Sequence, residues 1–542
     1  MPQHDATSDS SETAAATAVS GDALRDETLA MLRKIMDQKR NRMVLAFLLV
    51  VAALRSAAIL MSPLGLGVDE AQYWLWSQEF DFGYYTKPPL TSWIIGLSHM
   101  IFGHAEWAVR LPAPWLHLAT ALVLWRATDW LYGPRAGRWA AILWTLLPLV
   151  SLGSFVISTD TPLLLAYSCG LLALAGTLTN RISASRGLFY AGLATGIAML
   201  AKYAAIYFAL SLLLFAAWDR IAPTNKVARD NLAGDDITNN RTLTLPAIGL
   251  FAVGLLLAVG PNLIWNLVND FTTVRHLGDN ANLAKQSYSP GNMLGFWGAQ
   301  FGVAGPAAFA LMLTLFIPPF SGRTRRLLIC FATPPLLVIS IQAFVSEANA
   351  NWAAAALPAL IIWLAHWITS PGGIRWGLLA ASINGGIAAA FALAMFAGQF
   401  GPLTPDSDPL RRLRGWDQLA QDIAPALTGH NASMIVADRR ATAALLSWHF
   451  HHGITDAAGQ TIPVAIRVFD ADGIPSNHFE QNLNWTPQPG RRLLAVNGAT
   501  TPPTLPGVTW DAKTSLSDHA ISDNRRRSLY IYRGIEGPAV AD

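Results

Sequence analysis

Acidic and basic side chains stand at a few places where the apolar stretches of this 542-residue sequence are interrupted. Asp69 and Glu70 begin a segment rich in tyrosine and tryptophan, and Lys87 directly precedes Pro88 and Pro89. Carboxylates beside apolar surface are costly unless they are functional or paired; helix capping is the alternative interpretation. A proline holds the preceding residue in an extended conformation, so Lys87 stands on a stiff loop. It could bind a phosphate or anchor the loop to lipid headgroups.

Two more charged residues, Asp160 and Lys202, lie between apolar runs that follow each other closely. Asp160 could contribute to a site or cap a helix, because Pro162 suits the start of a helix. Lys202 should face a polar cavity or a partner, and a simple ion pair between helices is the alternative.

Weaker candidates occur in later turns. Arg275 and His276 could serve a phosphate or a metal, or belong to an ordinary polar loop. Glu347, Asn349 and Asn351 could contact a sugar or form a solvated turn. There is no zinc-type spacing of cysteine and histidine, no P-loop and no dinucleotide-binding glycine pattern.

The composition predicts a membrane protein. The chain is 52% hydrophobic and only 13% charged, whereas globular domains are about 25% charged. A helix needs roughly 20 apolar residues to cross the bilayer core. The net charge of +3 gives no indication of nucleic-acid binding, and Cys169 and Cys330 lie inside apolar runs, which argues against a disulfide framework. Eleven apolar runs fall at about 43–62, 108–131, 139–157, 162–180, 187–201, 203–218, 244–268, 292–318, 327–345, 352–369 and 376–398.

Charge placement sets the predicted orientation. If the N-terminus is cytoplasmic and 89–102 is an interfacial or re-entrant helix, eighteen lysines and arginines of the segments flanking the spans, from Arg33 to Arg375, lie inside and five lie outside. This asymmetry follows the rule that positive loops stay in the cytoplasm. We therefore predict a polytopic α-helical membrane protein with about eleven spans, a cytoplasmic N-terminus and a C-terminus on the outer side.

Three regions follow from this pattern. Residues 1–42 are expected to be a disordered, basic cytoplasmic N-terminus, and 43–400 the transmembrane domain with a first periplasmic loop at 63–107. Residues 401–542 are expected to be a small periplasmic α/β domain. Its predicted strands are Ser433–Ala437, Pro463–Phe469, Arg492–Val496 and Ser528–Tyr532, and its predicted helices are Asp417–Leu427 and Arg440–Phe450. His449, His451 and His452 suggest a metal, but we expect none.

The motifs together resemble one enzyme family. An Asp-Glu pair at 69–70, Tyr84-x-x-Lys87-Pro-Pro-Leu and an Asp160-x-Pro turn resemble the GT-C membrane glycosyltransferases. The nearest groups are the aminoarabinose transferases and the bacterial enzymes similar to protein O-mannosyltransferases. The resemblance covers about residues 43–400. The aminoarabinose transferases have a metal-binding Glu where this chain has Thr86, so we carry over neither the metal nor that sugar.

This resemblance implies transfer of a sugar from a polyprenyl-phosphate carrier to a lipid, glycan or protein acceptor on the periplasmic face, with no cofactor. The implied catalytic residues are Asp69 or Glu70, with Asp160 shaping the acceptor pocket. The expected donor-phosphate ligands are Tyr84, Lys87, Lys202 and Arg275. The expected acceptor or sugar contacts are Tyr85, His276, Glu347, Asn349 and Asn351. A transporter or flippase of lipid-linked sugars is the alternative, and a non-catalytic assembly component is a second one.

Overall fold

The computed structural model describes residues 9–221, 243–273, 288–401, 408–455, 459–471, 473, 475, 477–515, 519–522, 525–527 and 529–537. The chain forms two compact units, Met1–Val51 and Ala52–Asp542. The first unit contains the N-terminal part of α1 (Asp9–Leu60). Helix begins at Asp9, although disorder was expected there; the segment is rich in alanine, which favours helix.

Long apolar helices confirm the polytopic fold class. Within the described ranges, seven helices are long and apolar enough to cross a membrane, or eight if one bent pair is counted as a span. The seven are Lys34–Leu60 of α1, α8 (Asp160–Leu178), η1–α10 (Tyr203–Ile221), α11 (Leu245–Val268), α15 (Arg323–Val345), η3–α16 (Ala350–Thr369) and α17 (Ile374–Ala397). The bent pair is α13 (Pro290–Ala304) with α14 (Pro306–Met312) and η2 (Leu313–Phe316).

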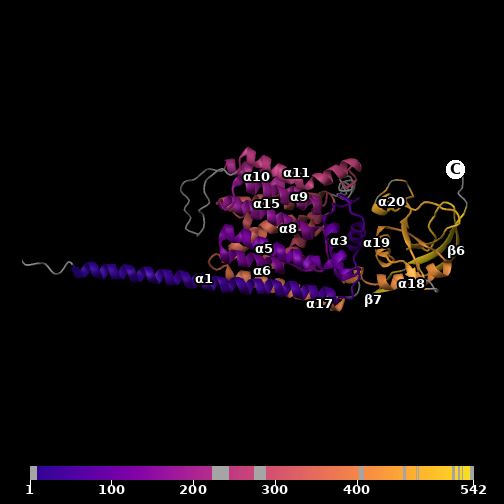
Figure 1. Cartoon of the computed structure of the whole chain (residues 1–542), viewed down its shortest axis with the longest axis horizontal. Helices are drawn as coiled ribbons and strands as arrows, with labels where there is room; N and C mark the ends of the chain where they lie inside the picture. Colours follow the sequence, from indigo (N-terminus) through magenta and orange to yellow (C-terminus); the bar gives the residue numbers. More distant parts are fainter. Residues whose placement is uncertain are drawn as a thin grey trace, which may run out of the picture. The chain divides into compact units, whose positions relative to one another are not determined.

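The other three predicted runs also coincide with helices. They are α5 (Pro112–Tyr132), α6 (Pro134–Leu146) with α7 (Pro148–Gly153), and α9 (Ala184–Ala201). Figure 1 shows these helices lying alongside one another. α8 and α16 are largely buried inside the protein, whereas α10, α11 and α17 expose most of their apolar side chains. The exposed apolar faces suit contact with lipid, where they carry no hydrophobic cost.

Glycines let α9 and α11 touch backbone to backbone. A Cβ at Gly192 would lie 1.9 Å from the carbonyl oxygen of Phe251, and a Cβ at Gly254 would lie 2.3 Å from that of Phe189. Small residues at helix contacts allow this close approach, which is typical of membrane helices. α9 is thereby fixed against α11, and the two helices end near the same loop.

The bend between α13 and α14 measures 111°. Gly305 makes it with a φ of +89°, which a side chain would strain, and Pro306 starts the next helix. The amide of Asn384 on α17 donates to the carbonyl oxygen of Ala304 at 3.0 Å. This bond satisfies a backbone group that the break frees inside an apolar region.

The segment between α1 and α5 contains three short helices, α2 (Val68–Ser77), α3 (Leu90–Phe102) and α4 (Glu106–Arg110). α3 has 13 residues, or about 20 Å of helix, which is too short to cross the bilayer core. It exposes Leu97, Met100, Ile101 and Phe102. This arrangement fits the interfacial helix that the sequence predicts for 89–102.

The C-terminal region is a small α/β domain, as predicted. Its five-stranded sheet has the order β4-β1-β5-β9-β6; β1 is parallel to β4 and β5, and β9 is antiparallel to β5 and β6. The sheet strands are β1 (Met434–Ala437), β4 (Ala465–Val468), β5 (Arg492–Asn497), β6 (Val508–Ser515) and β9 (Tyr530–Glu536). Two small hairpins add β2 (Ile454–Thr455), β3 (Thr461–Ile462), β7 (His519–Ser522) and β8 (Arg525–Arg527). The helical elements are η4 (Pro409–Leu413), α18 (Trp416–His430), α19 (Arg440–His449) and α20 (His478–Asn482).

Candidate active site

Glu70 anchors the start of α2 and is fully enclosed. Its two carboxylate oxygens accept hydrogen bonds from Arg110 at 3.0 and 2.8 Å. They also accept from the backbone amides of Gly67 at 2.9 Å and Ile157 at 3.2 Å. Both Glu70 and Arg110 are 1% exposed. Because every side of this carboxylate is occupied, Glu70 holds α2 against the loop before α8.

Asp69, the neighbouring acid, points elsewhere. It is 64% exposed and forms an ion pair with Arg440. Arg440 is the first residue of α19 in the C-terminal domain, and its guanidinium also contacts the side chain of Gln72 on α2. Sequence reasoning missed Arg440, because only the fold brings it to α2. Asp69 is therefore available to small molecules, with a cation beside it.

Asp160 connects three separate parts of the chain. It begins α8, where the helix dipole favours a carboxylate. Lys202, at the end of α9, donates to one oxygen at 2.7 Å. The amide of Asn351 in η3 donates to the other at 2.6 Å. The structure thus brings together three residues that the sequence singles out.

Lys87 lies within electrostatic reach of both acidic positions. Burial lowers the pKa of its ammonium, Lys202 and Arg440 lower it further, and Asp69 and Asp160 raise it. The five charged groups therefore surround one region. Among the residues that the structure describes, the Lys87 ammonium has no hydrogen-bond or ion-pair partner.

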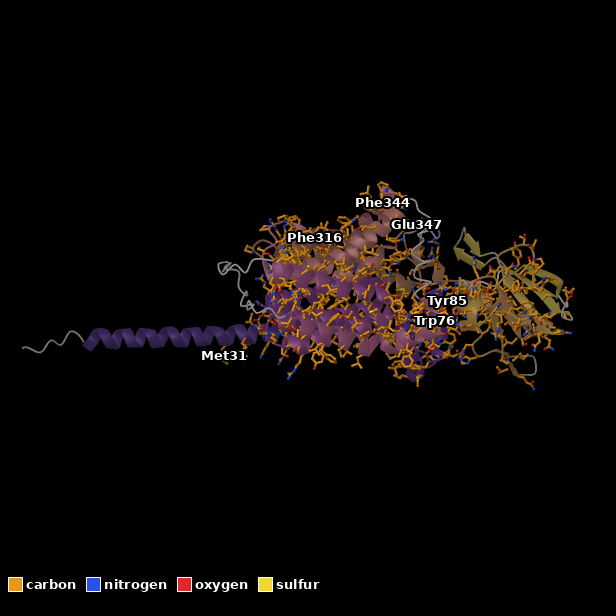
Figure 2. The ribbon with its side chains drawn as sticks, turned by 90° about the horizontal axis from the view of Figure 1, so that it is seen from above. Met31, Trp76, Tyr85, Phe316, Phe344 and Glu347 are labelled. Atoms are coloured by element: carbon orange, nitrogen blue, oxygen red, sulfur yellow. The ribbon has the colours of Figure 1, made fainter. Side chains whose placement is uncertain are left out.

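Tyr84 and Tyr85 lie in the same loop as Lys87, and their side chains make contacts that hold this loop in place. Tyr84 stacks on Trp76 with 5.0 Å between ring centroids, and its hydroxyl donates to the carbonyl oxygen of Glu79 at 2.8 Å. The Tyr85 hydroxyl donates to the carbonyl oxygen of Pro475 in the C-terminal domain. Figure 2 shows Trp76 and Tyr85 near the boundary between the helices and the strands. Both hydroxyls have backbone partners and stabilise the loop that carries Lys87.

The end of α11 fixes the same loop from another side. Asn262 donates to the carbonyl oxygen of Phe82 at 2.7 Å, and Trp265 donates to the carboxylate of Asp81 at 2.6 Å. Thr273, just beyond α11, donates to the carbonyl oxygen of Tyr84 at 2.8 Å. A polar cluster at the end of an apolar run was the available signal, and sequence reasoning did not use it. α11 therefore helps to set the position of Lys87.

An apolar cavity of about 450 Å³ reaches the Asp160 group. Asp160 and Asn351 lie on its wall together with mostly apolar residues of α7, α8, α13 and α17. This combination can hold an apolar chain close to a charged centre.

The remaining predicted site residues either lie away from the Asp160 group or fall outside the residues that the structure describes. Glu347 and Asn349 are exposed, and Figure 2 shows Glu347 close to Phe344. Neither side chain contacts the Asp160 group. Arg275 and His276 lie outside the described residues.

The charged groups add up to a small positive excess. Lys87, Lys202 and Arg440 supply three positive charges, and Asp69 and Asp160 supply two negative ones. The difference of +1 attracts an anionic ligand. Because the surroundings are partly desolvated, the attraction is stronger than it would be in water.

Some known proteins are similar to this chain in sequence, and others are similar in fold. A family described as dolichyl-phosphate-mannose-protein mannosyltransferase matches residues 86–229. The lipid A galacturonosyltransferase RgtD of Rhizobium johnstonii is 35% identical over 448 residues, which cover 80% of this chain and 86% of the relative.

Two crystal structures of ArnT from Cupriavidus metallidurans have a similar fold. The form bound to undecaprenyl phosphate matches with a TM-score of 0.60 and 15% identity over 90% of this chain and 97% of that one. The apo form matches with a TM-score of 0.58 and 14% identity over 91% of this chain and 98% of that one. The extensive sequence match and the common fold show that this multi-pass membrane chain belongs to the GT-C glycosyltransferases.

Proposed function

We propose that this glycosyltransferase moves a sugar from a polyprenyl-phosphate donor to lipid A or a similar envelope glycolipid at the periplasmic face. The observation that carries the proposal is the ammonium of Lys87, which has no partner among the described residues and lies within electrostatic reach of Asp69 and of the Asp160–Lys202 pair. A lipid-linked phosphodiester brings negative charge to this group. In this orientation the N-terminus is cytoplasmic.

The reaction is a single displacement at the anomeric carbon. A hydroxyl oxygen of the acceptor attacks C1 of the sugar, and the bond from C1 to the phosphate oxygen breaks. The hydroxyl proton passes to the carboxylate of Asp69, and polyprenyl phosphate leaves with both bonding electrons. The attack inverts the configuration at C1. The leaving phosphate gains a second negative charge in this step.

Each charged residue has a separate role in this scheme. Lys87 and Lys202 bind the phosphate and stabilise the charge that develops on it. Asp160 and Asn351 position Lys202 and the sugar. Glu70 is a positioning residue, because its carboxylate is committed to Arg110. Asp69 is the candidate base, because its side chain is accessible.

The apolar cavity supports a lipid-linked substrate. Its wall offers apolar contact for the first part of a prenyl or acyl chain, and the polar side chains of Asp160 and Asn351 reach it from one end. A donor bound there has its tail in the protein and its phosphate near Lys202.

An acidic donor sugar complements the site better than a cationic one. The relative RgtD is named a galacturonosyltransferase, and a uronate carboxylate adds a second negative charge to the donor. Three cations and two acids near the reaction centre favour this total over that of an aminosugar, whose ammonium cancels the phosphate charge.

The proposal is tested with purified full-length protein, lipid A and polyprenyl-phosphate-linked galacturonic acid. We expect a lipid A product heavier by one hexuronic acid in mass spectrometry, and faster transfer than with the matching galactose donor. Asp69→Asn should slow transfer about 10²–10⁴-fold with donor binding kept, because general bases contribute about this factor. Asp129→Asn is the matched control, since Asp129 forms an ion pair with Arg126 on its own helix, α5.

Unchanged turnover in Asp69→Asn would exclude the assigned base. Movement of intact donor across a vesicle membrane, without release of polyprenyl phosphate, would instead identify a flippase.

A further inference from the structure

We propose that His99, His104 and His451 form a binding site for a transition-metal ion such as Zn²⁺, which joins the first periplasmic loop to the C-terminal domain. One ligand nitrogen from each residue lies within 4.8 Å of the others. His99 is in the last turn of α3, His104 lies between α3 and α4, and His451 follows α19. Figure 1 shows α3 and α19 next to each other.

The ring positions fit a metal after a small contraction. The centroid of His104 is 5.6 Å from that of His99 and 4.9 Å from that of His451. Nitrogens around a tetrahedral zinc lie about 3.3 Å apart, given Zn–N bonds of roughly 2.0–2.1 Å. The ligand nitrogens, which lie within 4.8 Å of one another, would have to approach by up to about 1.5 Å through side-chain rotations. His452, whose centroid is 4.9 Å from that of His104, can supply a fourth nitrogen.

Two of these nitrogens lack partners. The Nδ1 atoms of His99 and His104 are buried, and no hydrogen-bond partner is found for either among the described residues. Buried polar atoms normally have partners, and a metal ion would serve both.

The surrounding aromatic rings hold the cluster in place. His104 stacks on Trp448 of α19 at 3.8 Å, and the rings of Trp74 on α2 and His451 are 4.8 Å apart. Trp74 is on the same helix as Asp69. A bound ion would therefore fix α3, α2 and α19 together close to the proposed active site. Packing alone accounts for the stacked rings, but it leaves the two Nδ1 atoms unsatisfied.

The site differs from what the sequence predicts. In the sequence, His451 stands close to His449 and His452. These three residues suggest a metal, but none was expected there. In the structure His449 turns away and lies 3.4 Å from the carboxylate of Asp417. The missing ligands are His99 and His104, about 350 residues earlier in the chain, and only the fold brings them to His451.

The test uses the full chain, purified through a tag without histidines, stripped with a chelator and titrated with Co²⁺ alone. We expect one equivalent to bind, with the visible absorption bands of a tetrahedral or five-coordinate cobalt site, and Zn²⁺ to displace it. Zn²⁺ should also raise the thermal unfolding temperature of the stripped protein. This result does not depend on glycosyl transfer.

Two variants decide whether these histidines are the ligands. His104→Phe keeps the ring that stacks on Trp448 but removes the nitrogen, and His451→Asn changes an exposed side chain that tolerates substitution. Each should weaken Co²⁺ binding at least about 100-fold and abolish the stabilisation by Zn²⁺. His430→Gln, in the same domain but outside the cluster, should leave both unchanged. Absence of the bands in the parent protein, or bands that survive in His451→Asn, would overturn the proposal.

Discussion

At the scale of single residues, adjacent acids have opposite surroundings. Glu70 is closed off by Arg110 and two backbone amides, whereas Asp69 is open to solvent beside Arg440. Neighbours on a helix point about 100° apart, so one faces the core and the other faces the site. The sequence indicates that the pair matters. It cannot indicate which member is free, because Arg110 and Arg440 reach α2 only in the folded chain.

The Glu70–Arg110 pair should be important for stability. Arg110→Met leaves a buried carboxylate without its charge partner, which costs about 3–5 kcal/mol. We expect a clear fall in the thermal unfolding temperature of the detergent-solubilised protein. Arg135→Met, an exposed arginine, is the control and should change little. Equal unfolding temperatures for the two variants would show that the pair contributes no net stability.

The ammonium of Lys87 should make donor binding pH-dependent. Burial and the nearby Lys202 lower its pKa, so it loses its proton at a lower pH than an ordinary lysine. The charged form binds phosphate, and donor affinity should therefore fall as pH rises through that lowered pKa. Lys87→Arg should move the fall to higher pH, because a guanidinium stays protonated.

The measurement is the dissociation constant of polyprenyl phosphate at several pH values. Lys87→Met should weaken binding about 10- to 100-fold at neutral pH, the usual size of a lost charged hydrogen bond. Lys39→Arg, at an exposed position in α1, should keep the parent profile. Identical pH profiles for the parent and Lys87→Arg would exclude Lys87 as a phosphate ligand.

At the scale of elements, helix contacts made by small residues position the site. Lys202 is at the end of α9, and α11 ends beside the loop that carries Lys87. The close contact of Gly192 with the backbone of α11 fixes one helix end relative to the other.

A methyl group at this contact should therefore disturb both stability and transfer. Gly192→Ala places a Cβ 1.9 Å from a backbone oxygen, so the helices must separate at a cost of about 1–3 kcal/mol. Gly249→Ala on α11 meets nothing within 4 Å and should be neutral or slightly stabilising. Thermal unfolding and transfer rate of both variants are compared with the parent. A Gly192→Ala protein as stable and active as Gly249→Ala would contradict this account.

The helices and strands were the features that could best be predicted from the sequence. Each of the eleven apolar runs coincides with a helix, because hydrophobicity alone decides which segments can enter lipid. In the C-terminal domain, β1, β4, β5 and α19 appear where alternating or helical patterns predict them. β6 (Val508–Ser515), at an edge of the sheet, was missed although its first six residues alternate between apolar and polar side chains.

The candidate site was predictable only in part. Asp160, Lys202 and Asn351 were chosen because each interrupts or borders an apolar run, and they meet in the structure. The hydroxyls of Tyr84 and Tyr85 donate to backbone carbonyl groups, and the contacts of these residues with donor and sugar stay predictions. Long-range partners such as Arg440 depend on tertiary packing, which no local pattern encodes.

At the scale of the whole molecule, basic residues are distributed unevenly along the sequence. Between residues 33 and 400, eighteen fall in segments predicted to be cytoplasmic and five in those predicted to be periplasmic. This bias sets the orientation of insertion. It predicts that the α/β domain and the candidate site face the periplasm.

Single cysteines can test this orientation. In a background with Cys169 and Cys330 replaced by alanine, we introduce either Gln421→Cys on α18 or Ser185→Cys on α9; both positions are exposed. Spheroplasts treated with a membrane-impermeant maleimide should label position 421 and not position 185. Permeabilised cells should label both. Labelling at position 185 alone in intact spheroplasts would invert the topology.

The ion pair between Arg440 and Asp69 has a consequence for how such enzymes can be recombined. Asp69 belongs to the helical membrane part of the chain and Arg440 to the C-terminal domain, so these two parts are matched to each other. A chimaera that grafts the extramembrane half of a distant homologue onto these helices would lose that match unless an equivalent arginine came with it. We therefore expect a chimaera to keep its substrate specificity only when the helical part and the C-terminal domain come from the same enzyme.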